Sequence, residues 1–269
     1  MKKIKMPWSR AEELPPPGPI DATAFMPVTA EDVARRKRRL ISSWAAVAIL
    51  VTLAALWIHK RSTDPLKAQE AFTAGQQLMT LAKYSQAILT FDRAIALKPD
   101  YAEAWMMRGR AHSALYETDA AIEDFTKAVH LRPKDAGTLL ERGQAYLSQK
   151  DYRAAIADGS AAAAVDPNRA AAYNLRGAAM RETGDPKMAL EDFNRAVQLD
   201  PNADNYFQRG ATYQRLGEYA LAIADFTRTI EFQPSLAQAY YARAEAERSA
   251  GDLRNAEKDH EQGRILDGR

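Results

Sequence analysis

The stretch Ala87-Ile-Leu-Thr-Phe91-Asp-Arg-Ala94-Ile-Ala-Leu-Lys-Pro99 decides the fold of this chain, because its pattern returns along the sequence. The pattern is an alanine, a phenylalanine four residues later, a second alanine and a closing proline. Its first alanine returns at Ala121, Ala155, Ala189, Ala222 and Ala256, a spacing of 34 residues with one step of 33. A fixed period of this length indicates a protein built from stacked repeats.

A second signature precedes each copy of the first. It is usually an aromatic residue or leucine, followed four positions later by glycine or alanine, as in Trp105 and Gly109. Together the two signatures closely resemble the tetratricopeptide repeat family over about residues 68–266. The resemblance implies an all-α fold, a right-handed α-solenoid of about six helical hairpins.

The residues alone lead to the same architecture. Between Thr118 and Leu131, apolar residues at spacings of three and four form one helical face, and Pro133 follows to end the helix. A single hairpin cannot bury such a face, so neighbouring hairpins must stack. The predicted repeat units are 68–101, 102–135, 136–169, 170–202, 203–236 and 237–266.

Charge is distributed unevenly along the chain. Residues 1–61 hold 11 Lys or Arg against 5 Asp or Glu, which leaves 26 against 30 in residues 62–269. The solenoid is therefore mildly acidic, and this argues against nucleic acid as a partner. The lack of cysteine excludes disulfides, thiolate nucleophiles and cysteine-based zinc sites.

The N-terminal section contains two different segments. Residues 1–34 are rich in proline and are predicted to form a disordered cytoplasmic tail, with a proline-binding partner as the alternative. Within residues 35–61, a basic flank leads into 19 uncharged residues, 40–58, with Trp44 and Trp57 near the two ends of the run. A helix of this length covers roughly 28 Å, close to the hydrocarbon thickness of a bilayer. We therefore expect a single transmembrane helix at 40–58.

The flanking charges predict the orientation of this helix. Arg35-Arg-Lys-Arg-Arg39 precedes it, and the shorter basic run His59-Lys60-Arg61 follows it. The positive-inside rule places the N-terminus in the cytoplasm and the solenoid on the periplasmic side of the inner (plasma) membrane. Small residues four apart, such as Ser42 and Ala46, could also join two such helices into a homodimer.

Arginine and aspartate recur at fixed places in five of the six repeats. The arginine lies in the first helix, and the aspartate follows 16 residues later in the second. The pairs are Arg108/Asp124, Arg142/Asp158, Arg176/Asp192, Arg209/Asp225 and Arg243/Asp259. The first repeat lacks both, with Ala74 and Thr90 at these places. Because the arginine and the aspartate occur together in five repeats and are both missing from the first, we predict that they form a bidentate ion pair between the two helices. The functional alternative is a ladder of arginines that binds an acidic ligand.

The third repeat departs from the pattern, because Gly159 stands where four other repeats have phenylalanine. A glycine inside a helix costs about 1 kcal/mol relative to alanine, and the lost ring leaves volume to fill. We expect the neighbouring helices to pack more closely here. A soft joint or a small cleft is the alternative.

The family resemblance implies that the first helices line a concave groove that binds a peptide or a partner helix. The groove would present Phe72, Met106, Met107, Arg110, Gln144, Asn174, Arg181, Phe207, Gln214 and Tyr241. Packing between adjacent repeats is the alternative role for the apolar members. The lysine and asparagine clamp with which some relatives bind a C-terminal carboxylate has no counterpart in this sequence.

No catalytic constellation accompanies the repeats. The four histidines share no metal-ligand spacing, and neither a phosphate-binding loop nor a nucleophile elbow occurs. We therefore expect no enzymatic activity, no metal and no cofactor.

The sequence thus predicts a non-catalytic, membrane-anchored scaffold that holds protein partners near the membrane, during assembly or organisation of a cell-envelope complex. A transport receptor with its solenoid in the cytosol and a structural subunit of a membrane complex are the alternatives.

Overall fold

The computed structural model describes residues 29–268, except for the side chains of residues 32, 35–46, 48 and 53–63. The described residues form twelve helices and no strand. The helices are α1 (Ala30–Thr80), α2 (Tyr84–Leu97), α3 (Ala102–Ala114), α4 (Thr118–Leu131), α5 (Ala136–Ser148), α6 (Tyr152–Val165), α7 (Ala170–Glu182), α8 (Pro186–Leu199), α9 (Ala203–Arg215), α10 (Tyr219–Phe232), α11 (Ala237–Ser249) and α12 (Leu253–Leu266).

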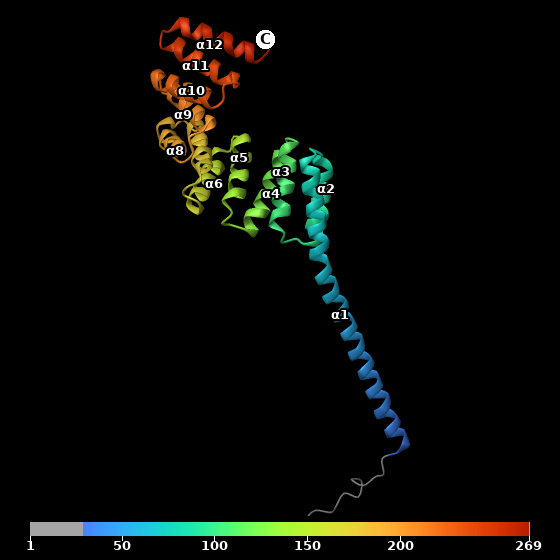
Figure 1. Ribbon diagram of the computed structural model, residues 1–269. Helices are drawn as coiled ribbons and strands as arrows, with labels where there is room; N and C mark the ends of the chain where they lie inside the picture. Colours follow the sequence, from blue (N-terminus) through green and yellow to red (C-terminus); the bar gives the residue numbers. More distant parts are fainter. Residues whose placement is uncertain (1–28, 269) are drawn as a thin grey trace, which may run out of the picture. The chain divides into compact units, whose positions relative to one another are not determined.

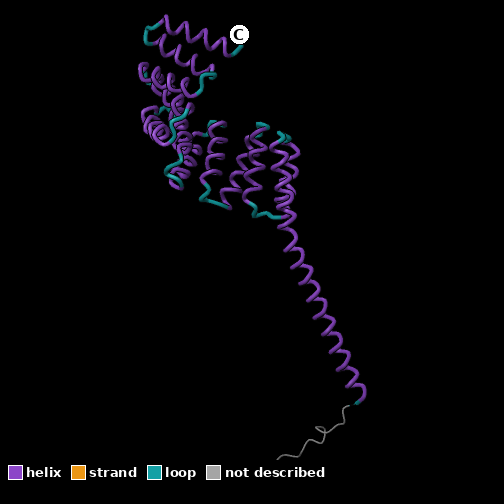
Figure 2. Tube along the Cα trace, viewed as in Figure 1, coloured by secondary structure: helices purple, strands orange, loops and turns teal. Residues whose placement is uncertain are grey.

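The chain divides after Lys60 into two compact units, and the second unit, Arg61–Arg269, holds the repeats. In that unit the helices form the hairpins α3/α4, α5/α6, α7/α8, α9/α10 and α11/α12, and short loops join the helices (Figures 1 and 2). The last part of α1 packs on α2 in the same way, through Ala68, Ala71 and Phe72. The predicted all-α solenoid is therefore confirmed.

The two sequence signatures form the core of each hairpin. The phenylalanine of the second helix is fully buried at Phe91, Phe125, Phe193 and Phe226. Its ring lies against the glycine of the first helix, where no side chain fits. A Cβ placed on Gly109 would lie 2.8 Å from Cε1 of Phe125, well inside the contact distance. The glycine and the phenylalanine are thus one packing unit, and this explains their fixed spacing.

The third repeat is closely packed at Gly159, as the sequence led us to expect. A Cβ on Gly159 would lie 2.9 Å from the Cβ of Arg176 and 3.2 Å from the carbonyl oxygen of Ala172, both on α7. The space left by the missing phenylalanine is filled by Leu175, whose Cδ2 would lie 2.4 Å from a Cβ on Gly143. The fourth repeat therefore supplies the apolar side chain that the third one lacks.

The N-terminal predictions concern residues that the structure describes only in part. Residues 1–28 of the predicted tail lie outside the described residues, and α1 begins at Ala30. Most side chains of the predicted membrane span, residues 40–58, also lie outside them. Among the residues that the structure describes, none of the helices combines the length and the apolar character needed to cross a bilayer.

Candidate partner-binding groove

The first helices of the repeats lie on the inner side of the curved stack. Helices α3, α5, α7 and α9 each contact the first helix of the next repeat, in addition to the second helices beside them. Second helices of successive repeats make no such contacts among the described residues. A stack whose first helices approach one another more closely than its second helices do must curve toward the first helices. These helices therefore line the concave face of the solenoid.

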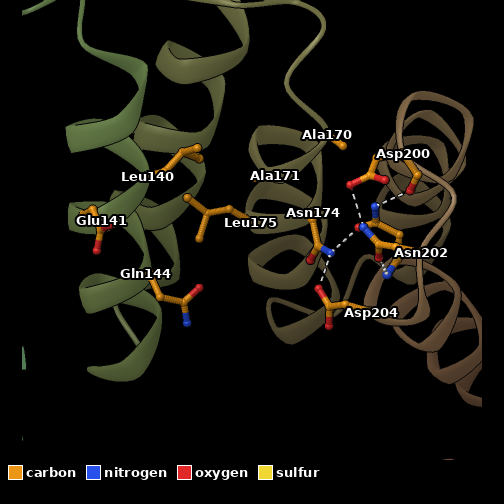
Figure 3. Close-up of a pocket in the computed structure, with 11 residues that line it drawn as sticks. Leu140, Glu141, Gln144, Ala170, Ala171, Asn174, Leu175, Asp200, Asn202 and Asp204 are labelled. Carbon is orange, nitrogen blue, oxygen red and sulfur yellow. Dashed lines mark hydrogen bonds between the residues drawn. The ribbon is translucent and has the colours of Figure 1, made fainter. Parts of the chain in front are cut away.

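A pocket of about 370 Å³ opens on this face between α5, α7 and α9. Its lining comprises Leu140, Glu141, Gln144, Ala170, Ala171, Asn174, Leu175, Asp200, Asn202, Asp204 and Asn205. In Figure 3, Glu141 and Gln144 lie on one side and Asp200, Asn202 and Asp204 on the other, with Leu140 and Leu175 between them. The pocket thus combines an apolar centre with polar and acidic sides.

A shortened turn builds the polar side. Three residues, 200–202, separate α8 from α9, whereas four separate second and first helices at every other described junction. This deletion accounts for the single 33-residue step in the period. It places Asn202 at the start of α9, where its side-chain oxygen accepts a hydrogen bond from the backbone N–H of Asn205 at 2.9 Å.

Asn205 occupies a core position that is Ala104, Thr138, Ala172 or Ala239 in other repeats, and it is only 3% exposed. Its Nδ2 donates to the carbonyl oxygen of Asp200 at 2.7 Å. Its Oδ1 accepts from Nδ2 of Asn174 at 2.7 Å, and the same Nδ2 donates to Asp204 Oδ2 at 3.0 Å. Buried amides need such partners. Asn205 and Asn174 therefore fix the side of the pocket that carries Asp200 and Asp204, which we call the acidic wall.

The carboxylates of this wall have amide partners and no cation among the described residues. Asp200 accepts from Asn202 Nδ2 at 2.6 Å, and Asp204 accepts from Asn174 and, at 3.4 Å, from Gln208 Nε2. Across the pocket, Glu141 Oε1 binds Arg110 Nη2 at 2.7 Å. The pocket lining contains no lysine or arginine. Its electrostatic character is therefore acidic.

Two of the ten residues that the sequence placed in the groove, Gln144 and Asn174, line this pocket. Gln144 is exposed, and its amide makes no hydrogen bond within the described residues. Arg110 lies beside the pocket through its ion pair with Glu141. Arg181 instead joins α7 to α9, where its Nη1 and Nη2 donate to the backbone oxygen and Oε1 of Gln208 at 3.2 and 3.0 Å. Burial lowers the pKa of Arg181.

The structure places the other predicted groove residues mainly within the repeat packing. Phe72 is buried, with its ring centre 4.9 Å from that of Tyr101, and Met107 packs against the same cluster. Met106 contacts the cluster of Phe125, and the Phe207 ring lies 5.5 Å from that of Phe226.

Near the C-terminus, Tyr241 packs against His260 at 5.4 Å and donates to Asp267 Oδ2 at 3.1 Å. Gln214 is half-buried in α9. Neither residue lines the pocket.

The five arginine–aspartate pairs are confirmed as bidentate contacts between the two helices of a repeat. Nε and Nη2 of each arginine donate to the two carboxylate oxygens, and the Arg142 pair, at 2.8 and 2.6 Å to Asp158, is representative. The third nitrogen, Nη1, reaches back to the second helix of the preceding repeat. Its acceptors are Asp92, Thr126, Ser160, Asn194 and Thr227. These guanidinium groups are therefore engaged within the solenoid and are not presented to a ligand.

In the part of the chain that the structure describes, no group of three or more His, Cys, Asp or Glu side chains is suited to holding a metal ion. The acidic side chains of the pocket are separated by amide groups. The arrangement that the groove offers is an apolar floor, hydrogen-bonding amides and negative charge.

Sequence reasoning missed the acidic wall, although one signal for it was visible. Asp200, Asn202, Asp204 and Asn205 all lie at or next to the shortened turn, the one irregular step of the period. Asn205 also replaces a small core residue by a larger polar one. A buried amide at a core position requires partners close by, and this pointed to a local polar cluster.

The sequence and the fold were compared with those of known proteins. Two profiles of the tetratricopeptide repeat match the chain, one at residues 72–136 and 207–263 and the other at residues 170–203, together more than half of its length. No protein with a curated description matches the chain. Solved structures that are similar to it include the crystal structure of MamA, 25% identical with a TM-score of 0.54, over 62% of this chain and 92% of that one.

Two further solved structures share the fold at lower identity. Pseudomonas aeruginosa pilF is 18% identical with a TM-score of 0.65, over 77% of this chain and 93% of that one. YrrB, whose crystal structure is described as that of a repeat protein with an unusual peptide-binding site, is 21% identical with a TM-score of 0.51. That alignment covers 65% of this chain and 91% of YrrB.

Proposed function

This chain is a tetratricopeptide repeat protein, and from that premise we propose that it is a membrane-anchored scaffold whose concave groove holds a segment of a partner protein. Tetratricopeptide repeat proteins generally mediate protein–protein interactions as non-catalytic scaffolds. The observation that carries the proposal is the pocket between α5, α7 and α9, a part of the concave face that repeat packing leaves open. An apolar floor with convergent polar groups is the usual form of a binding site.

The contacts around the pocket suit an extended segment. Leu140 and Leu175 provide the floor, and the exposed amide of Gln144 can both donate to and accept from a peptide backbone. The walls are held by bonds between repeats, namely Asn174 to Asn205 and Arg110 to Glu141. A site braced in this way loses little freedom when a partner binds, which favours affinity.

The membrane anchor of the proposal comes from the sequence. The uncharged run at 40–58, with Trp44 and Trp57 near its ends, has the length and flanks of a transmembrane helix. Few residues separate it from the first repeat, so the anchor would tether the solenoid, and a partner held by it, near the membrane. The stronger basic flank, Arg35–Arg39, supports a cytoplasmic N-terminus and a solenoid in the periplasm, where the scaffold would serve a cell-envelope complex.

The basic run His59-Lys60-Arg61 favours a second candidate, in which the solenoid faces the cytosol and receives client proteins for transport. Reporters active only in the cytoplasm or only outside it, fused after Arg269, separate the two. A C-terminus outside the cytoplasm supports the envelope scaffold, whereas a cytosolic C-terminus contradicts it and leaves the receptor.

The groove itself is tested by site-specific crosslinking in intact cells. A photo-crosslinking amino acid at Gln144 is expected to capture a partner protein, and the same amino acid at Glu191, an exposed site on the second helix α8, is expected not to. Equal capture at the two positions, or no capture at Gln144, would contradict a partner in the groove. The second result would favour a structural subunit that contacts its complex elsewhere.

A further inference from the structure

The acidic wall of the pocket favours ligands that carry positive charge and hydrogen-bond donors. Among the described residues, Asp200 and Asp204 form no ion pair, and Glu141 Oε2 accepts no hydrogen bond. A carboxylate offers about four acceptor positions, so each of these groups keeps capacity for a further donor. A cationic group entering the pocket would meet the uncompensated carboxylates of Asp200 and Asp204 on one wall. On the other wall it would meet Oε2 of Glu141, whose Oε1 is paired with Arg110.

We propose that the pocket between α5, α7 and α9 binds the lysine or arginine side chain of an extended segment of the partner protein. This inference rests on the proposed function, since it names the chemistry of the segment that the groove holds. The binding of a basic side chain would make charge complementarity the source of specificity. The net negative charge of residues 62–269, with 26 basic and 30 acidic side chains, agrees with this.

The shape of the pocket fits such a side chain. Lysine and arginine carry an apolar stem and a charged head, and they bury the stem along apolar surface. Leu175, 5% exposed, and the half-buried Leu140 form the surface for the stem. The head would reach Asp200 and Asp204. The volume of about 370 Å³ is at the small end of the range for ligand sites, roughly 300–1,000 Å³, and suits one side chain with its backbone.

Hydrogen bonds within the fold hold the acidic side chains of the pocket in fixed positions. Asp204 is held by Asn174, and Asn174 is held by the buried Asn205. Asp200 lies in the three-residue turn and is bonded to Asn202. Four-residue turns stand at the equivalent places of the other repeats, so the three-residue turn and the Asp200 and Asn202 side chains of this wall belong together.

The test is selection of peptides from a random phage-displayed library on the full-length chain. The wild type is expected to enrich peptides with a lysine or arginine at one fixed place. The double variant D200N/D204N keeps the size of both side chains and removes their charge, and it is expected to lose this preference. The matched control E191Q/E257Q changes net charge by the same amount at exposed sites of α8 and α12, and it is expected to keep the preference.

A selected peptide then gives the quantitative test by fluorescence anisotropy. Replacing its basic residue with norleucine is expected to weaken binding to the wild type by about tenfold or more, and to have little further effect on D200N/D204N. Higher salt should weaken only the basic peptide.

The outcomes separate the inference from the function on which it rests. Enriched peptides without a basic preference, or a preference that D200N/D204N retains, would overturn the inference and leave a peptide-binding groove. A failure to enrich any peptide overturns the inference as well. In that case the crosslinking result at Gln144 decides whether the groove function fails with it.

Discussion

Arg176 and Asp192 are joined by two parallel hydrogen bonds, with Nε and Nη2 of the guanidinium each 2.7 Å from a different carboxylate oxygen. Asp192 is only 6% exposed, and the pair raises the pKa of Arg176. The remaining nitrogen, Nη1, lies 3.4 Å from Ser160 Oγ in the preceding repeat. One side chain therefore links two helices of its own repeat to a third helix. Because solenoid stability is a sum over neighbour interfaces, this link matters more than an ordinary surface ion pair.

We expect the substitution Arg176→Ala to lower the free energy of unfolding by about 2–4 kcal/mol, because it leaves the buried carboxylate of Asp192 without its donor. Arg176→Lys should recover only part of the loss, since an ammonium group cannot form the two parallel bonds. Urea denaturation followed by circular dichroism measures both effects. The control Arg195→Ala removes an arginine that bonds only to Gln198 on the same helix, and its cost should be below about 1 kcal/mol. Similar losses for Arg176→Ala and Arg195→Ala would contradict the structural role.

The sequence predicted the structural features that recur from repeat to repeat and missed those that occur only once. The pairing of Arg176 with Asp192 followed from its spacing, because five copies share it and the first repeat lacks both members. The close approach at Gly159 was also expected. Both depend on contacts that every repeat makes with its neighbour, so a periodic pattern is enough to locate them.

The pocket could not be predicted in the same way, because it arises where the period fails. The shortened turn before α9 and the polar core residue Asn205 occur once each. Spacing also could not distinguish residues that face the groove from residues that pack on the next repeat. Adjacent positions on one helix point in directions about 100° apart, so the positions that face the groove border those that pack on the next repeat. Phe72 and Asn174 hold equivalent positions in their first helices, but Phe72 is buried against Tyr101 whereas Asn174 lines the pocket.

At Gly159 of α6 we expect glycine to be more stabilising than alanine, whereas at the exposed position 157 of the same helix we expect the reverse. Gly159→Ala places a methyl group against the backbone of α7, within 3.2 Å of Ala172 O and Arg176 N. Neither atom is the end of a flexible side chain, so the helices must move apart, and we expect a loss of about 1–3 kcal/mol. Ala157 is exposed on the same helix. There alanine is the better residue, and Ala157→Gly should cost about 1 kcal/mol through helix propensity.

Thermal unfolding of the two variants and the wild type provides the comparison. A Gly159→Ala protein more stable than the wild type would show that α6 and α7 separate easily. That result would favour the soft joint that the sequence left open as an alternative.

Glu247 predicts a pH dependence of stability at the end of the solenoid. Its side chain is 8% exposed, Oε2 has no hydrogen-bond partner among the described residues, and Arg243 Nε lies 4.0 Å from Oε1. Burial and the nearby charge of Asp259 raise the pKa of Glu247 above its ordinary value of 4.5. An acid whose folded pKa is raised favours folding while it is protonated, and this contribution is lost as the pH rises through the folded pKa.

We therefore expect Glu247→Gln to be more stable than the wild type at pH 7, by about 1 kcal/mol, because a buried carboxylate without a partner is costly. The difference should shrink as the pH falls from 7 through the raised folded pKa, and it should be small below 4.5, where the carboxyl group is protonated in both states. Urea denaturation at pH 7 and pH 4 measures it. As a control, Glu245→Gln alters an exposed glutamate on the same helix and should show no such trend. A variant less stable than the wild type at pH 7 would mean that the contact with Arg243 outweighs the burial.

Asn174 provides the link between stability and binding in the groove. Asn174→Ala removes the donor to Asn205 Oδ1, a group that is buried and has no other donor among the described residues, and it also frees Asp204. An unsatisfied buried acceptor costs about 1–3 kcal/mol, so the variant should unfold at lower urea concentration. Asn168→Ala, at an exposed turn position, should leave the urea midpoint unchanged.

Asn174→Ala should also weaken the binding of a peptide selected on the wild type, because Asp204 loses the hydrogen bond from Asn174 that positions it. Fluorescence anisotropy measures this under conditions where the variant is fully folded. Loss of stability with unchanged peptide affinity would show that Asn174 supports the fold and does not position the acidic wall.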